Sequence, residues 1–114
     1  MRRDFEGLAR ALIGRRFRPQ GRDANGLDCL GLVIACFELP PDCARRNYAL
    51  RGDHCAELQE GLGRHFRRIA RTQARPGDLL LLRAGPDQLH LAVKSSAGFV
   101  HADARLRKVV ETPG

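Results

Sequence analysis

The stretch GLDCLGLVIACF, residues 26–37, decides how this chain is interpreted. It places Cys29 directly after Asp28 and at the start of an almost wholly apolar run that reaches Phe37. A run of this composition predicts a buried helix over 29–37, which stops at Pro40-Pro41 because proline cannot continue a helix. Cys29 therefore stands at the expected helix start, either as a buried helix residue or as a nucleophile.

The position of Cys29 favours a reactive thiol. Unpaired backbone N–H groups and the positive end of the helix dipole stabilise a thiolate at a helix start. The charge of Asp28 opposes the thiolate, although its carboxylate can instead cap the helix by accepting an N–H bond. Cys36 lies about two turns further along among apolar neighbours, which predicts a buried and inert thiol. Cys43 and Cys55 belong to no motif.

Length and charge limit the classes of function. A chain of 114 residues predicts one domain, 1–114, and the absence of Trp predicts a core of aliphatic residues and Phe. The net charge of +7 favours contact with a polyanion, such as nucleic acid, an anionic cell-wall polymer or an acidic peptide. Because arginines are not interleaved with aromatic residues and no recognition helix is evident, no specific nucleic-acid partner is expected.

The cysteine spacing and the N-terminus carry further expectations. The four cysteines contain no CxxC pair, and a zinc site from Cys29, His90 and His101 would lack a fourth ligand, so no metal or cofactor is expected. The segment MRRDFEGLARALIG lacks the apolar core and cleavage site of a secretory signal, which predicts synthesis in the cytoplasm and free thiols. No apolar run approaches the roughly 18 residues of a membrane span.

Periodicity predicts helices in the first part of the chain and strands in the second. Residues 4–15 carry a helical stripe of Phe5, Leu8, Ala9, Leu12 and Ile13, and a polar loop follows to Gly26. Residues 40–53 are expected to form a loop, and 54–70 an amphipathic helix with an arginine-rich outer face. Four strands follow, at 79–83, 89–94, 99–102 and 108–111, with turns at 85–87 and 95–98. This order predicts an α+β fold with an antiparallel sheet.

Two histidines fall in neighbouring predicted strands. His90 lies in QLHLAV and His101 in FVHAD, and the hairpin between these strands can place the two imidazoles side by side. In such a pair, one imidazole can act as base toward a thiol while the other fixes its tautomer and orientation. Taken alone, a histidine within a strand is more often structural. His54 and His65 are interpreted as surface residues.

Four blocks of the chain together resemble a known family. GLDCLGLV, ARPGDLLLLR, LHLAV and FVHAD, in this order, are similar to the NlpC family of papain-like cysteine peptidases. The similarity extends from about Leu12 to Glu111. It is strongest to the short cell-wall peptidases encoded with phage and phage-like tail genes, whose cysteine block often has D-C-L-G-L. The resemblance implies a papain-like fold in which the nucleophile helix packs on a small antiparallel sheet.

The same resemblance implies the site and its substrate. Cys29 corresponds to the nucleophile, His90 to the general base and acid, and His101 to the residue that orients His90. The reaction would be hydrolysis of an amide bond in a peptidoglycan stem peptide, between D-glutamate and diaminopimelate, without metal or cofactor. Asp28, Phe17 and Leu30 correspond to positions that line the substrate site.

Three departures from the family pattern leave alternatives open. Phe17 stands where many members have a tyrosine, Leu30 stands where a serine follows the cysteine, and related chains usually continue into a further strand beyond Gly114. These departures motivate a non-catalytic component of a phage-like tail that keeps the same fold. An amidase or acyltransferase could also use the same three residues on another substrate.

Overall fold

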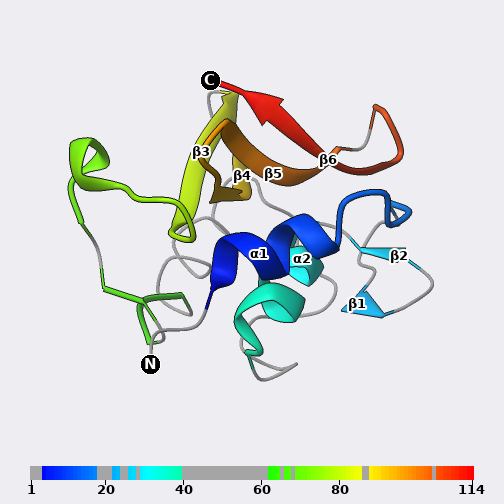
Figure 1. Ribbon diagram of the computed structural model, residues 1–114, viewed down its shortest axis with the longest axis horizontal. Coiled ribbons are helices and arrows are strands. Elements are labelled where there is room, and N and C mark those ends of the chain that lie inside the picture. The colour runs from blue at the N-terminus through cyan, green and yellow to red at the C-terminus, as the bar shows by residue number, and fades with distance from the viewer. Residues whose placement is uncertain are drawn as a thin grey trace.

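The fold has two layers, a pair of helices and a four-stranded antiparallel sheet (Figure 1). The computed structural model describes residues 4–17, 22–23, 26–27, 29–39, 62–64, 66–67, 69–85, 88–103 and 105–114. The helices are α1 (Phe5–Ala11), α2 (Cys29–Phe37) and the short 3-10 helix η1 (Arg71–Gln73). The strands are β1 (Arg22–Asp23), β2 (Gly26–Leu27), β3 (Leu79–Gly85), β4 (Gln88–Lys94), β5 (Gly98–Asp103) and β6 (Lys108–Pro113). The α+β prediction is therefore confirmed.

Helix α2 has the limits that the apolar run predicts, but a different residue ends it. Glu38 follows the helix with a left-handed φ of 55°, and Leu39 N–H donates to the carbonyl of Ile34 at 3.1 Å. This hydrogen bond across the last turn satisfies a carbonyl that would otherwise lack a partner. The helix thus ends at Phe37, before the prolines expected to stop it, and those prolines lie outside the described residues.

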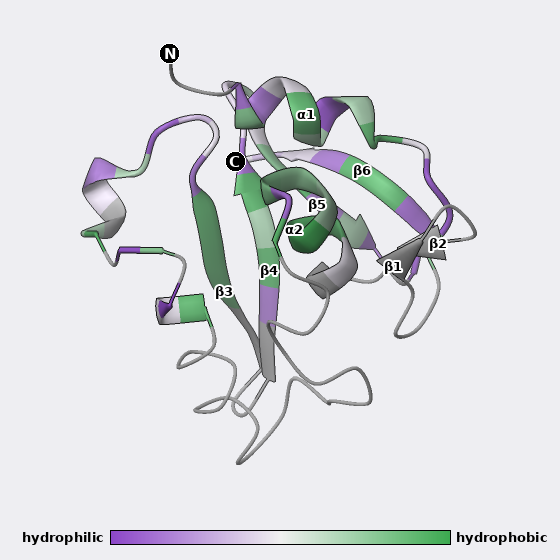
Figure 2. Cartoon of the chain, turned by 90° about the horizontal axis from the view of Figure 1, so that it is seen from below, coloured by the Kyte–Doolittle hydropathy of each residue, from purple (hydrophilic) through white to green (hydrophobic). Residues whose placement is uncertain are grey.

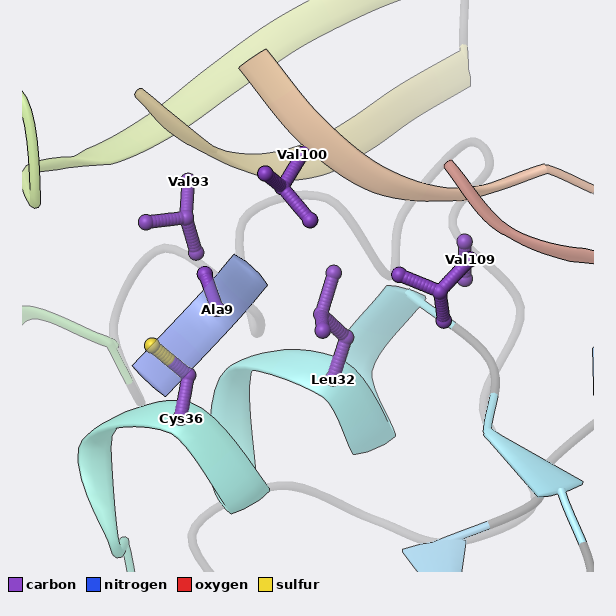
Figure 3. Close-up of a cluster of buried hydrophobic side chains, with 7 residues drawn as sticks. Ala9, Leu32, Cys36, Val93, Val100 and Val109 are labelled. Carbon is purple, nitrogen blue, oxygen red and sulfur yellow. The ribbon is translucent and has the colours of Figure 1, made fainter. Parts of the chain in front are cut away.

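The core lies between the helices and one face of the sheet, and Figure 3 shows side chains from both layers meeting there. Helix α2 contacts β4 and β5, and α1 contacts β4. Every fully buried Leu or Val side chain contributes about 1.5–3 kcal/mol to folding, so this contact sets the position of the helices on the sheet. The cluster comprises Ala9, Leu32, Cys36, Val93, Val100, Ala102 and Val109.

Helix α1 is shorter than the 4–15 stripe predicts. It ends at Ala11, and Gly14 follows with a φ of 94°, a conformation that glycine adopts without steric cost. The chain then pairs with β6, because Gly14 N–H donates to the carbonyl of Val109 and Val109 N–H donates to that of Arg15. Ile13 consequently lies 42% exposed, which corrects its expected place in the buried stripe.

The helix expected over 54–70 is wrong for its described end. Leu62 is buried and Phe66 N–H donates to its carbonyl, but residues 66, 67, 69 and 70 are not helical, and Ile69 is 41% exposed. Leu62 and Gly63 are helical, as expected, but the helix does not continue beyond them. Gly63 favours this early end, since glycine inside a helix costs about 1 kcal/mol relative to alanine. Residues 40–61, with His54, Cys43 and Cys55, lie outside the described part, as does His65.

The sheet is the antiparallel meander that the sequence predicts, in the order β3-β4-β5-β6. Its strands are longer than expected, and Gly85 still pairs with Gln88 across the first hairpin. Ser95 N–H donates to the carbonyl of Gly98, and Gly98 N–H donates to Ser95 Oγ at 3.0 Å, so the predicted 95–98 turn is confirmed. The β1–β2 ribbon lies where a loop was expected, because strands of two residues leave no periodic pattern.

Polar contacts join α1 to the sheet at its outer edge. Glu6 accepts hydrogen bonds from Ser96 N–H at 2.6 Å and from the Ser96 hydroxyl. Arg10 forms an ion pair with Glu111 at 3.0 Å and a longer one with Glu6 at 3.6 Å. The Ser96 bonds lower the pKa of Glu6, and bonds from Ser95 and then Arg10 lower the pKa of Glu111.

The lowered pKa values of Glu6 and Glu111 predict that the folded chain loses stability in acid. Because their pKa values are lower in the folded protein than the ordinary 4.5, their contribution is present above pH 4.5 and is lost as pH falls through the lowered values. The melting temperature of Glu6→Gln/Glu111→Gln should therefore fall less steeply below pH 4.5 than that of the wild-type chain. Identical slopes in thermal unfolding followed by circular dichroism would contradict this assignment.

Candidate active site

The sheet brings His90 and His101 into direct contact. His90 lies on β4 and His101 on the neighbouring β5, and a hydrogen bond of 2.9 Å joins His90 Nε2 to His101 Nδ1. The ring centroids are 5.0 Å apart and the rings are nearly perpendicular, at 87°. The predicted juxtaposition of the two imidazoles is confirmed, and it leaves the second ring nitrogen of His90, Nδ1, on the side away from His101.

Strand alternation separates the histidines from the helix-facing core. Val100 and Ala102, on either side of His101 in β5, both belong to the buried cluster. Since successive side chains of a strand point to opposite faces, His101 points to the other face of the sheet. It is only 9% exposed, and the ring of Phe99 lies 4.9 Å from its own. The imidazole of His101 is thus a buried polar group that needs partners for both nitrogens.

Thr112 supplies the second of these partners. His101 Nε2 lies 2.8 Å from the hydroxyl oxygen of Thr112, on β6. A continuous chain of hydrogen bonds therefore runs from His90 through His101 to Thr112, across three adjacent strands. The sequence analysis did not identify Thr112. Its signal would have been its register, because it lies two residues beyond Val110, the partner of His101, and so on the same face.

Burial and charge set the protonation of the pair. Burial lowers the pKa of His90 first, and the neighbouring His101 lowers it further. Burial also lowers the pKa of His101, while the carboxylate of Asp103 raises both values. Asp103 is itself held as an anion, because hydrogen bonds from the backbone N–H groups of Leu106 and Arg105 lower its pKa. Both imidazoles are accordingly biased toward the neutral form.

The cysteine helix begins where the sequence analysis expects it. Cys29 is the first residue of α2, and α2 contacts both of the strands that carry the histidines. The side chains of Cys29 and Leu30, and all of Asp28, lie outside the described residues, so their roles stay predictions. Phe17 is half-buried and packs against the core cluster, and its expected place in the substrate site also stays a prediction.

Cys36 has the surroundings of an inert thiol, as expected. It is fully buried, and its Sγ–H donates to the carbonyl of Phe5 at 3.3 Å. Burial raises its pKa to about 11, so almost no thiolate forms near neutral pH. It forms no disulfide.

Within the described ranges, no group of three or more His, Cys, Asp or Glu side chains could hold a metal ion. No helix in that part of the chain is long and apolar enough to cross a membrane.

Comparison with solved structures identifies the class of fold. The chain resembles the crystal structure of the NlpC/p60 domain of the peptidoglycan hydrolase SagA, with a TM-score of 0.68 and 20% identity. The match covers 96% of this chain and 86% of that one. This chain therefore has the NlpC/p60 type of papain-like α+β fold, as the sequence blocks predicted.

Sequence comparison adds particular relatives. Over 90 residues the chain is 31% identical to the murein DD-endopeptidase MepS/murein LD-carboxypeptidase of Escherichia coli K12, and equally to its counterparts in strains CFT073 and O157:H7. The match covers 78% of this chain, which spans only 43% of the length of these relatives. No family model matches the chain.

The geometry of the pair predicts how the histidines titrate. In a Cys29→Ala chain, where no thiolate at residue 29 can contribute, both should titrate below the ordinary 6.5. The folded chain then binds fewer protons than the unfolded one, so this burial lowers stability as pH falls below 6.5. Adding His101→Asn removes the electrostatic effect of the neighbouring imidazole, and the pKa of His90 should rise without reaching 6.5, because burial remains. Imidazole NMR titration measures both, and a His90 pKa above 6.5 in Cys29→Ala would contradict the assignment.

Proposed function

We propose that this chain is a cysteine peptidase that hydrolyses amide bonds in peptidoglycan stem peptides. The observation that carries the proposal is the hydrogen bond between His90 Nε2 and His101 Nδ1, which orients the His90 imidazole and leaves its Nδ1 on the side away from His101. That the thiol of Cys29, at the first residue of α2, reaches Nδ1 of His90 is part of this proposal and rests on the family resemblance. The murein endopeptidase relatives support the class of substrate.

The mechanism follows from these roles. His90 Nδ1 takes the proton of the Cys29 thiol, and the thiolate attacks the amide carbonyl. Backbone N–H groups at the start of α2 stabilise the oxyanion, since they lack partners within the helix. His90 then protonates the leaving amine, which departs and leaves a thioester. Finally, His90 removes a proton from water, the hydroxide attacks the thioester, and the acid product and the free thiol are released.

In this mechanism, an ion pair between the Cys29 thiolate and the His90 imidazolium would offset the effect of burial, which lowers the pKa of His90. A buried imidazole without an anion nearby stays neutral, and the positive charge it acquires in the reaction needs a counter-charge. The thiolate supplies this counter-charge, and the dipole of α2 favours the thiolate in turn. The pKa of His90 should therefore be higher in the wild-type chain than in Cys29→Ala.

The activity is tested with Cys29→Ala and His90→Ala, measured by chromatography and mass spectrometry on purified peptidoglycan and defined stem peptides. Each variant should lose at least about a thousandfold in kcat/KM, the order seen when a nucleophile or base is removed. Both should keep the wild-type melting profile. Cys36→Ala is the matched control, because Cys36 lies on the same helix but faces the core, and it should keep full turnover. Undiminished turnover by Cys29→Ala would refute the proposal.

A second measurement tests the nucleophile without a substrate. A small electrophile should alkylate Cys29 with a pKa below the ~8.5 of an ordinary thiol, and His90→Ala should return it toward that value. Cys36 should react only after unfolding. If Cys29 reacts as an ordinary thiol or not at all, the fold serves assembly rather than hydrolysis.

The bond proposed to be cleaved lies between D-glutamate and diaminopimelate. The chain is also proposed to be part of a phage-like tail. The family resemblance as a whole supports the bond, and the D-C-L-G-L block supports the phage-like tail. The chain would be made in the cytoplasm and act on the cell wall with other tail proteins. Since the relatives are named murein DD-endopeptidase and murein LD-carboxypeptidase, the activity assay should also test these two kinds of murein cleavage beside cleavage of the D-glutamyl bond. Antibody detection in purified tail particles tests the association.

A further inference from the structure

The hydrogen-bond chain from His90 to Thr112 has two possible directions. Each neutral imidazole carries one proton, and a hydroxyl can donate or accept. In one direction His90 Nε2–H donates to His101 Nδ1, and His101 Nε2–H donates to Thr112 Oγ1. In the other, Thr112 donates to His101 Nε2, His101 Nδ1–H donates to His90 Nε2, and the proton of a neutral His90 sits on Nδ1. The two directions have different chemical consequences.

Only the first direction serves the proposed reaction. To take the proton of a thiol, Nδ1 of His90 must be unprotonated, which puts the His90 proton on Nε2. Once His90 is an imidazolium, both of its nitrogens donate, so His101 Nδ1 must accept. His101 then carries its proton on Nε2 in both states, and that N–H is almost fully buried. A buried N–H without an acceptor is destabilising, so the productive direction requires an acceptor at the position of Thr112.

The fold holds the Thr112 hydroxyl in place from both sides. Glu111, the preceding residue, is fixed to Arg10 by the 3.0 Å ion pair. On the other side, Thr112 pairs with Phe99, and Pro113 pairs with Gly98. A Cβ on Gly98 would overlap the carbonyl oxygen of Thr112, so the close approach of β6 to β5 requires glycine there.

We propose that Thr112 is a positioning residue, whose hydroxyl accepts the Nε2–H of His101 and thereby fixes the direction of the hydrogen bonds that present Nδ1 of His90 to the thiol. This inference rests on the proposed function for the role of His90. Thr112 itself touches neither the nucleophile nor the reacting bond in this scheme. It acts through His101.

Thr112→Val tests the inference, because valine keeps the branched shape and removes the hydroxyl. The expected result is a roughly tenfold fall in kcat with little change in KM, the size of one buried hydrogen bond. The range of pH over which the enzyme is active should also narrow at both its acid and its alkaline end. A less stable His90 imidazolium raises the pKa of Cys29 and lowers the pKa of His90. Thr112→Ser, which keeps the hydroxyl, should have the wild-type kcat and the wild-type pH profile of activity. Thr72→Val is the matched control on exposed η1 and should change nothing.

Nitrogen-15 NMR of the imidazoles supplies a readout that needs no activity. In wild-type protein near pH 7, His101 should be protonated on Nε2 with slow proton exchange, and in Thr112→Val it should become a mixture of tautomers. A wild-type His101 protonated on Nδ1 would overturn the inference even if Thr112→Val failed to fold. A Thr112→Val protein with wild-type tautomers and pH profile would also overturn it. Inactive wild-type protein with the expected tautomers would refute the proposed function and leave the direction of the hydrogen bonds established.

Discussion

In β5, neighbouring side chains meet two different environments, because a strand directs successive residues to opposite faces of the sheet. Val100 and Ala102 pack against the helices, while His101 between them meets His90 and Thr112. A slip of one residue in the pairing of β5 with β6 would turn an imidazole into the aliphatic core and two aliphatic side chains out of it. The register that builds the core is therefore also the register that assembles the hydrogen-bond chain. Figure 2 shows the helices covering the sheet from one side.

The site balances burial against the need for charge. Burial makes both imidazoles poor cations, which suits a base that must be neutral before it acts, and Asp103 moderates this effect from the end of β5. No described anion touches His90, so in the proposed reaction its positive charge would be balanced by the thiolate that the same proton transfer creates. The proposed mechanism thus couples the charge of the base to that of the nucleophile. The polar partners beyond His101 orient the rings and carry no full charge to the reacting atoms.

The sequence predicted those features that depend on local pattern. The apolar run gave the limits of α2, the alternation after Leu79 gave the meander, and the hairpin at 95–98 gave the contact of the two histidines. It did not predict the early end of α1 or the loss of helix at 66–70, because Gly14 after α1 and Gly63 in the last helical turn outweigh the apolar period. Thr112 was missed for a different reason. A threonine near the end of a strand has no pattern of its own, and its meaning comes only from the strand that it pairs with.

The ion pair between Arg10 and Glu111 joins groups separated by 101 positions in the sequence. Leu32 and Val109 share the core across a similar stretch of chain. During synthesis, α1 and α2 therefore leave the ribosome long before the strands that cover them, and an isolated helix of this length is marginal in water. The core is complete only once β6, which follows the other described strands along the chain, has been made, and the apolar α2 lacks part of its cover until then. The order of elements in this fold therefore separates the synthesis of its apolar helix from that of the strands that cover it.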